Sequence, residues 1–207
     1  MKLSQLIALS FATLPFIGGL AHAADAAAEK ADPALQNTVQ TCAACHGASG
    51  RSVAPTFPNL AAQTAPYLEA QLKAFKDQTR GDPDAQAYMW GMAAPLSEAM
   101  ITELAAYYAK QTPAKGTGGD TALIARGKEV FEKGIPAAQI PACATCHGAH
   151  AQGMASFPRL AGQHAPYLLK QLLVIQSALR NAPVMHGVVK ELTRDQMLAV
   201  TAYLESI

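Results

Sequence analysis

The chain has 207 residues, of which half are hydrophobic and 15% are charged. This composition favours a compact fold and excludes an intrinsically disordered chain, which has too little apolar surface to bury. The 16 basic and 15 acidic residues nearly cancel, which excludes the strongly basic surface of a nucleic-acid-binding protein. The length allows one domain or two.

The N-terminus has the parts of a secretory signal peptide. Lys2 precedes an apolar run from Leu6 to Leu20, and residues 21–23 offer small residues at both positions of a cleavage site. We therefore predict that residues 1–23 are a signal peptide removed on export. A retained membrane anchor is the alternative, but the run is short for a spanning helix. No comparable run follows, so we expect a soluble mature chain without stable membrane insertion.

All four cysteines lie in two copies of a Cys-x-x-Cys-His motif. The pattern is typical of covalent haem c attachment, because two thiols one helical turn apart can each bind a porphyrin vinyl group and the next histidine can bind the iron. A disulfide, a thioredoxin-like redox pair or a shared zinc site would leave both histidines unexplained. We predict two haem c groups, attached through Cys42, Cys45, Cys143 and Cys146 and ligated by His46 and His147.

An internal repeat predicts the domain organisation. Residues 57–68 match residues 157–168 at an offset of 100, and an Ala-Tyr pair recurs near the end of each half at an offset of 96. A segment rich in Gly, Pro, Thr and Lys, residues 111–121, separates the halves and is typical of a linker. The sequence therefore predicts two domains, residues 24–110 and 122–207.

Helix signals recur in both halves, and no convincing alternating stretch predicts a sheet. A first-turn proline opens predicted helices over residues 67–76 and 167–179. Ser97 and Thr193 are the predicted N-caps of the last helices. Apolar residues three and four positions apart in those helices form a face that can cover a haem. We therefore predict an all-α fold of two small helical domains, each enclosing a covalently bound haem.

Each iron also needs a sixth ligand. Met89 and Met185 are related by the same offset of 96 that aligns the last helices. A methionine is more often flexible core filler, but recurrence at the same place in both halves favours ligation. His186 could replace Met185, yet Trp90 stands at its place in the first half. An iron held by His and Met has no vacant position for substrate, which indicates a carrier of single electrons.

Other side chains have alternative interpretations. Pro58 and Pro158 either shape a turn or offer a carbonyl to the iron-binding imidazole. Arg80 and Arg180 either pair with haem propionates or lie solvated at helix ends. His164 has no counterpart in the first half, and we predict that it lies at the surface or caps a helix.

With these features assembled, the chain resembles the dihaem cytochrome c4 family over nearly all of the mature sequence. The resemblance rests on the tandem haem motifs, on Pro-x-Leu-Ala-x-Gln…Tyr-Leu-x-x-Gln-Leu in both halves, and on a methionine before each final helix. It implies two tandem class I cytochrome c domains related by a pseudo-twofold axis, with the haems near their interface. It also implies a periplasmic carrier between an upstream quinol-oxidising complex and a membrane-bound terminal oxidase.

The first half departs from this family pattern. Gly127 and Phe131 look like the glycine and aromatic positions of the usual N-terminal cytochrome helix, but the segment before Cys42 has no clear equivalent. Ala62 also stands where the second half has Gly162. The opening helix of the first domain is therefore left open.

Two further functions are weighed against a free carrier. Similar dihaem chains serve as cytochrome subunits of flavin-dependent sulfide-oxidising dehydrogenases. A dihaem enzyme, such as a peroxidase or a thiosulfate dehydrogenase, would need one iron that opens or carries a different ligand. No spare cysteine exists to act as that ligand, so we predict an electron carrier without catalytic residues.

Overall fold

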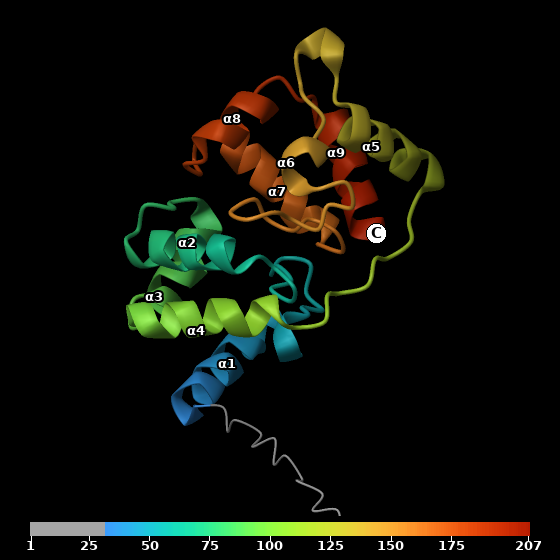
Figure 1. Cartoon of the computed structure of the whole chain (residues 1–207). Helices are drawn as coiled ribbons and strands as arrows, with labels where there is room; N and C mark the ends of the chain where they lie inside the picture. Colours follow the sequence, from blue (N-terminus) through green and yellow to red (C-terminus); the bar gives the residue numbers. More distant parts are fainter. Residues whose placement is uncertain (1–31) are drawn as a thin grey trace, which may run out of the picture. The chain divides into compact units, whose positions relative to one another are not determined.

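A computed structural model describes residues 32–207 of the protein (Figure 1). The predicted signal peptide, residues 1–23, lies outside the described residues. We call residues 32–110 the first half and residues 122–207 the second half. Regular structure in the described range is helical, which confirms the all-α prediction. Within residues 32–207, no helix combines the length and the apolar character needed to cross a bilayer.

The helices follow one another in a similar order in both halves. The first half contains α1 (Pro33–His46), η1 (Ala48–Gly50), α2 (Ala65–Lys76), η2 (Ala85–Met89), α3 (Trp90–Ala93) and α4 (Glu98–Ala109). The second half contains α5 (Thr121–Lys133), η3 (Pro136–Ala138), α6 (Ala144–His147), α7 (Ala165–Gln176), α8 (Pro183–Val189) and α9 (Arg194–Ser206). Between α4 and α5 an extended segment without regular structure connects the halves (Figure 1).

The first-turn proline of α2 and α7 confirms how these two helices begin. Their ends are set by the backbone two residues further on. Gln78 has φ = +57° and Ala178 has φ = +59°, and this left-handed conformation cannot continue a right-handed helix. For this reason α7 stops three residues before the predicted end at residue 179.

Polar caps fix the start of the last helix in each half. Ser97 Oγ accepts a hydrogen bond from the Met100 N–H (3.1 Å), and Thr193 Oγ1 accepts one from the Gln196 N–H (3.3 Å). The Thr193 N–H donates in return to Gln196 Oε1 (2.9 Å), which completes a capping box. Each cap satisfies an N–H group that the first helical turn leaves without a partner. Both predicted N-caps are confirmed.

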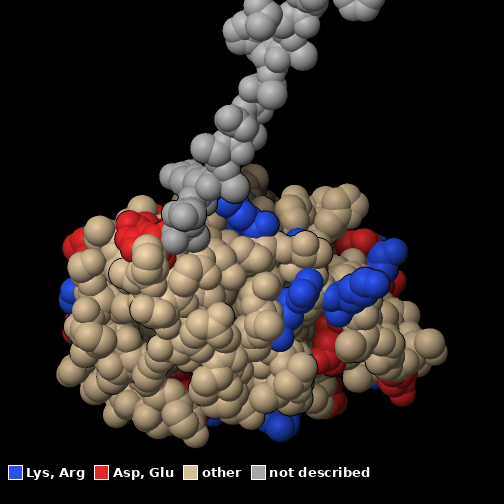
Figure 2. Space-filling model, turned by 90° about the horizontal axis from the view of Figure 1, so that it is seen from below, with Lys and Arg blue, Asp and Glu red and all other residues tan. Residues whose placement is uncertain are grey.

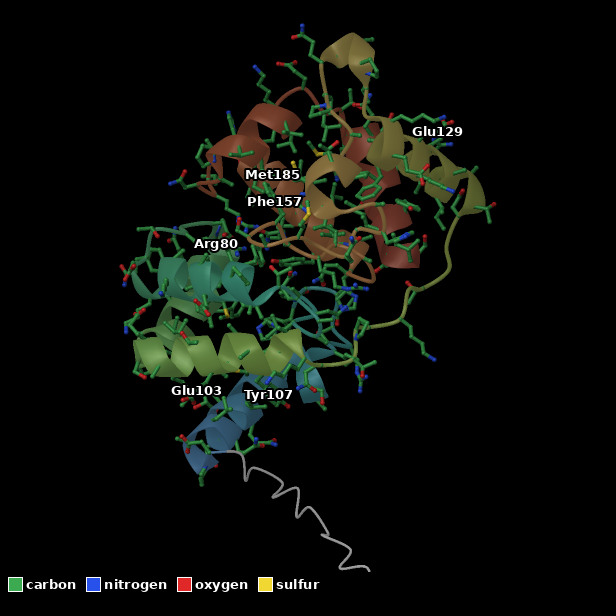
Figure 3. The ribbon with its side chains drawn as sticks, in the orientation of Figure 1. Arg80, Glu103, Tyr107, Glu129, Phe157 and Met185 are labelled. Atoms are coloured by element: carbon green, nitrogen blue, oxygen red, sulfur yellow. The ribbon has the colours of Figure 1, made fainter. Side chains whose placement is uncertain are left out.

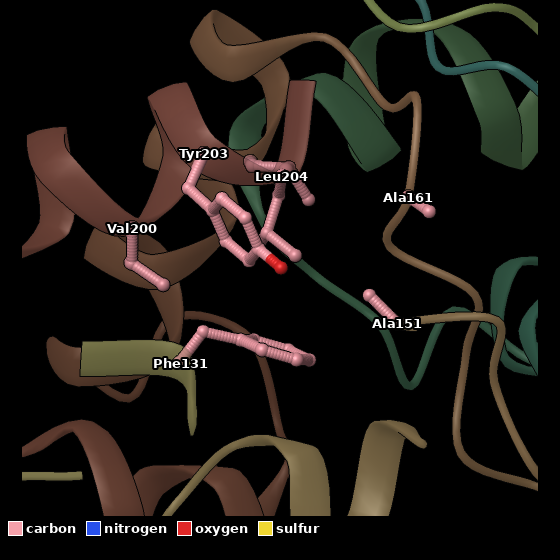
Figure 4. Close-up of a cluster of buried hydrophobic side chains, with 7 residues drawn as sticks. Phe131, Ala151, Ala161, Val200, Tyr203 and Leu204 are labelled. Carbon is pink, nitrogen blue, oxygen red and sulfur yellow. The ribbon is translucent and has the colours of Figure 1, made fainter. Parts of the chain in front are cut away.

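The second half is built on a close crossing of α5 and α9. A Cβ added to Gly127 would lie 1.9 Å from the Ala199 carbonyl oxygen, so only glycine lets the two backbones approach this closely. One turn later Phe131 packs against Tyr203, with ring centroids 5.6 Å apart. Figure 4 shows these rings with Leu204 in one buried cluster. The glycine and aromatic positions of α5 thus bring it onto the core.

The first half does have an opening helix, which answers the question left by its sequence. α1 continues without a break into the haem motif and ends at His46. Val39 of α1 is buried in a cluster with Leu104, Ala105 and Tyr108 of α4. α1 is therefore held to α4 through a valine side chain, whereas α5 is held to α9 at a glycine.

In two turns of each half, residues with left-handed backbones occur, and the halves exchange alanine and glycine there. Ala62 has φ = +56° where Gly162 has φ = +70°. In the other turn Gly50 has φ = +77° and Ala151 has φ = +50°, and the carbonyl of each accepts the two N–H groups of the repeated Leu-Ala pair. A Cβ in this conformation costs roughly 1–2 kcal/mol. Each half therefore carries this cost at a different turn.

Charged side chains are dispersed over the surface. On the face shown in Figure 2, most of the surface is uncharged, and the basic and acidic residues lie in small groups of mixed sign. Ion pairs such as Lys73–Glu98, at 3.1 Å, join well-exposed side chains. Exposed pairs of this kind contribute about 0–1 kcal/mol. The fold therefore depends on its buried clusters rather than on surface charge.

Candidate functional site

Each haem motif ends in a histidine whose ring is held by a backbone carbonyl. His46 Nδ1 lies 2.9 Å from the Pro58 oxygen, and His147 Nδ1 lies 2.9 Å from the Pro158 oxygen. A carbonyl can only accept, so Nδ1 carries the proton and Nε2 keeps a free lone pair. Burial lowers the pKa of both histidines, and the bond to the carbonyl opposes this only in part. Both rings are therefore neutral imidazoles suited to bind iron.

His147 Nε2 is the clearest sign of a bond to something other than the protein. The residue is 4% exposed, and this nitrogen has no hydrogen-bond partner among the described residues. Leaving a buried polar atom unpaired costs about 1–3 kcal/mol. The ring is also fixed in orientation by the edge of Phe157, with centroids 6.2 Å apart, as His46 is by Phe57 at 6.1 Å. An iron ligated at Nε2 would satisfy this atom.

The cysteines stand in the spacing that vinyl attachment needs. α1 carries Cys42 and Cys45 one turn apart, while Cys143 immediately precedes α6, which contains Cys146. No disulfide joins any of the four in the part of the chain that the structure describes. Burial raises the pKa of Cys42, and it raises the pKa of Cys143 to about 11. Reactive redox cysteines have lowered pKa values, so these shifts disfavour the thioredoxin-like alternative.

Met89 and Met185 reach the same cavity as the histidines from unlike helices. Met89 ends η2, a wide π-helical turn of the kind often found at functional sites, and Met185 lies in α8. Both side chains are half-buried. Figure 3 shows Met185 with Phe157, and both belong to the cavity wall. Met92 is 44% exposed.

The cavity has a volume of about 880 Å³, and its wall includes both histidines and four methionines, namely Met89, Met92, Met100 and Met185. Three of the four cysteines also line it, and much of the remaining wall is apolar. Imidazole, thioether and paired thiols are the groups that hold haem c, and an apolar cavity of this size suits large planar groups. The residues present therefore fit two covalently bound haems. The individual ligand assignments stay predictions.

Two arginines are buried where the halves meet. Arg80 and Arg180 are 7% and 8% exposed, so their predicted alternative as solvated helix-end residues is wrong. Each guanidinium donates to both Gln71 Oε1 and Gln171 Oε1, at 2.7–2.8 Å, so every one of the four side chains contacts the opposite half. Arg80 Nε also donates to the fully buried Asp82 (2.9 Å). Figure 3 shows Arg80 on the side of its half nearest the other.

Two further glutamines join the halves reciprocally. Gln163 Oε1 accepts from the Asn59 N–H (2.8 Å), and Gln163 Nε2 donates to the Asn59 carbonyl (2.9 Å). Gln63 makes the same pair of bonds to Arg159, at 2.7 and 3.0 Å. Sequence reasoning did not single out these glutamines as functional. The signal was available, because both end the repeated Pro-x-Leu-Ala-x-Gln stretch.

Three other side chains have clear roles in the structure. Trp90 Nε1 donates to the Arg80 carbonyl (2.8 Å), which makes it a packed indole. His186 Nδ1 lies 2.9 Å from a backbone carbonyl of α7. His164 does not cap α7 with its side chain. Its backbone stands at the N-cap position of α7, as the capping alternative predicts, while its Nε2 lies 3.1 Å from the Ser52 carbonyl of the first half instead of at the surface.

Both halves of the chain are similar to known proteins. The family model for cytochrome c matches the chain twice, over residues 23–111 and 124–207. Cytochrome c-552 of Acidithiobacillus ferridurans is 41% identical over 96% of this chain and 86% of its own length. The thiosulfate dehydrogenase electron acceptor of Thiomonas intermedia is 37% identical over 95% of this chain and 88% of its own.

A solved structure extends the similarity to three dimensions. The cytochrome c4 of Acidithiobacillus ferrooxidans, whose structure is described as supporting a complex-induced tuning of electron transfer, superimposes with a TM-score of 0.78. The two chains are 42% identical, and the match covers 81% of this chain and 99% of the other.

Proposed function

This chain belongs to the cytochrome c4 family and is a dihaem electron-transfer protein with two covalently bound haem c groups, and we propose that it works in the periplasm between respiratory donors and a terminal oxidase. The expected signal sequence and the absence of predicted catalytic residues support a secreted carrier rather than an enzyme. The relatives are named as cytochromes or as an electron acceptor, which favours the same interpretation.

We propose that the first haem is attached to Cys42 and Cys45 and the second to Cys143 and Cys146. His46 and Met89 would ligate the first iron, and His147 and Met185 the second. A haem iron with imidazole and thioether ligands supplies one-electron chemistry at a raised reduction potential. The observation that carries the proposal is that each imidazole has its Nδ1–H tied to a carbonyl, with a methionine on the wall of the same cavity.

The protein's own residues prepare each site for rapid electron transfer. The carbonyl bond fixes the tautomer and the angle of each imidazole, so the ring does not need to turn when the iron changes charge. The apolar wall keeps bulk water away, which limits solvent reorganisation around the site. Full coordination would keep small ligands off both irons.

An absorbance titration of the purified holoprotein tests the ligand assignment. We expect the ferric methionine-to-iron charge-transfer band for both haems, and no binding of carbon monoxide to the ferrous protein. One haem that lacks the band and binds carbon monoxide would contradict a closed His/Met site and would favour an enzyme.

The electron donor is tested separately. We propose an upstream quinol-oxidising complex, and a thiosulfate dehydrogenase is a second candidate because the Thiomonas relative is named as the acceptor of such an enzyme. Stopped-flow mixing of the oxidised protein with each purified donor should show rapid haem reduction by one of them. Slow reduction by both would exclude both donors. If membranes that contain the oxidase do not speed the oxidation of the reduced protein, the terminal oxidase is excluded as the acceptor.

A further inference from the structure

Each iron-binding imidazole is connected to the opposite half through a single peptide group. The Pro58 carbonyl that accepts from His46 Nδ1 and the Asn59 N–H that donates to Gln163 Oε1 belong to the same peptide bond. In the second half the peptide after Pro158 does the same, accepting from His147 and donating to Gln63. The path of hydrogen bonds from Gln163 therefore ends at His46, and the path from Gln63 ends at His147.

The orientation of both carboxamides is fixed by their partners. Each Oε1 accepts a hydrogen bond from an N–H of the opposite half, and the Nε2 of the same carboxamide donates to the carbonyl of that residue. If the amide oxygen and nitrogen were exchanged, a donor would face a donor and an acceptor would face an acceptor. Gln63 is 6% exposed and Gln163 is 5% exposed. Each Oε1 also accepts a hydrogen bond from the backbone N–H of the next residue, which is Thr64 or His164. The carboxamides are thus buried and held in one state.

A hydrogen bond at one end of a peptide group strengthens a bond at the other. Acceptance of the N–H by Oε1 polarises the attached carbonyl, and such cooperativity adds roughly 10–30% per bond in condensed phases. A more polar carbonyl draws the Nδ1 proton more strongly and gives the imidazole more anionic character. A more electron-rich imidazole stabilises ferric iron, and the hydrogen bonds that metal-binding histidines donate to neighbouring acceptors commonly have this effect.

We propose that Gln63 and Gln163 are positioning residues, each acting through the iron-binding histidine of the opposite half to lower the reduction potential of that haem. This inference rests on the proposed ligation by His46 and His147. Each half would then contribute to the potential of a haem that it does not itself bind. In both paths the peptide N–H donates to the glutamine and the peptide carbonyl accepts from the histidine, so both contributions have the same sign.

The experiment measures both haem potentials in the full-length holoprotein carrying Gln163→Leu or Gln63→Leu. Proton NMR of the haem methyl groups during a redox titration reports the two haems separately. For Gln163→Leu we expect the equilibrium constant for reduction of the first haem to rise about threefold, which is about 28 mV at 59 mV per tenfold for one electron. The second haem should change far less. Gln63→Leu should show the reverse.

A matched control separates this effect from a loosened interface. His164→Phe removes a contact between the halves, the 3.1 Å approach of His164 to the Ser52 carbonyl. That carbonyl accepts no hydrogen bond from an iron-binding histidine. We expect this substitution to move neither potential selectively. In the ferrous protein, the Nδ1–H proton signal of His46 should move upfield in Gln163→Leu and stay in place in Gln63→Leu.

Several outcomes would overturn the proposal. Shifts on the haem of the substituted half, equal shifts on both haems, or the same pattern in His164→Phe would each do so. If Gln163→Leu fails to retain haem, Gln163→Asn applies the same test, because its shorter carboxamide remains polar but cannot reach Asn59. A wild-type protein without the methionine charge-transfer band would instead refute the proposed ligation, so the two failures are distinguishable.

Discussion

The two halves share the turns around the haem cavity and differ most in the helix that opens each of them. In both, an imidazole Nδ1 lies 2.9 Å from a proline carbonyl, and a Leu-Ala pair donates two N–H groups to one left-handed residue. By contrast, α1 continues directly to His46, whereas α5 ends at Lys133 and a separate turn precedes α6.

This difference teaches which contacts tolerate change. The shared turns place atoms against the cavity, where an error of an ångström would misplace a ligand. The opening helices contact other protein side chains, and apolar packing of about the right volume has many solutions. A valine on α1 and a glycine on α5 are two such solutions.

Loss of a haem should have the largest effect on this comparison. In Cys42→Ala/Cys45→Ala, we expect the first half to lose its helical structure, because a domain of its size has too small a core without the haem. The matching pair, Cys143→Ala/Cys146→Ala, should do the same to the second half. Far-UV circular dichroism should fall by up to about half in each variant. Native intensity in either would refute the role of haem in the core.

The glycine crossing of α5 should be the most sensitive protein contact. Gly127→Ala forces a Cβ against the Ala199 carbonyl, and we expect it to lower the free energy of unfolding by about 3 kcal/mol. Gly187→Ala is the control in the same half, since nothing lies within 4 Å of its added Cβ. In α8 that change should be neutral or stabilise by up to about 1 kcal/mol. Equal unfolding midpoints for the two variants would contradict the close crossing.

Each methionine substitution should change the reduction potential of one haem and leave that of the other haem nearly unchanged. Met89→Ala is expected to lower the potential of the first haem, and Met185→Ala that of the second, by an amount on the order of 0.1 V within the roughly 0.8 V that axial ligands set. Met92 lines the same cavity but is 44% exposed, so Met92→Ala should leave both potentials unchanged. Spectroelectrochemical titration measures all three. A similar shift of both haems in either variant would count against the assignment.

The exchanged turn residues should give the smallest effects, of opposite sign. Ala62→Gly removes a left-handed alanine and should stabilise the first half by about 0.5–1 kcal/mol after the flexibility of glycine is counted. Gly162→Ala should destabilise the second half by at least as much, since its Cβ would lie 2.7 Å from the Ala114 carbonyl. Chemical unfolding of both variants checks the signs, and a destabilising Ala62→Gly would refute the strain at this turn.

Much of this fold was predictable because its signals are local. The haem motifs, the first-turn prolines and the caps at Ser97 and Thr193 depend on residues a few positions apart, and the structure confirms the helices that they predict. The histidine–carbonyl bond was one of two stated alternatives for Pro58 and Pro158. The repeat aligned Met89 with Met185, and both reach the cavity wall.

The features that the sequence did not predict depend on contacts between the two halves. Arg80 and Arg180 are charged and follow helices, which usually means exposure, yet each is buried against glutamines of the other half. The contact of His164 with the Ser52 carbonyl was missed for the same reason. α1 was hard to recognise because its contact with α4 uses Val39, which no glycine pattern reveals.

The contacts of Gln63 with Arg159 and of Gln163 with Asn59 are isologous in the sense used for twofold dimers. Each half carries both members of the pair, a glutamine and the backbone that a glutamine binds, so its inner face is complementary to a copy of itself. The segment between α4 and α5 converts what would be a concentration-dependent dimer into an intramolecular one. The relative placement of the two haems is thereby independent of how dilute the protein is.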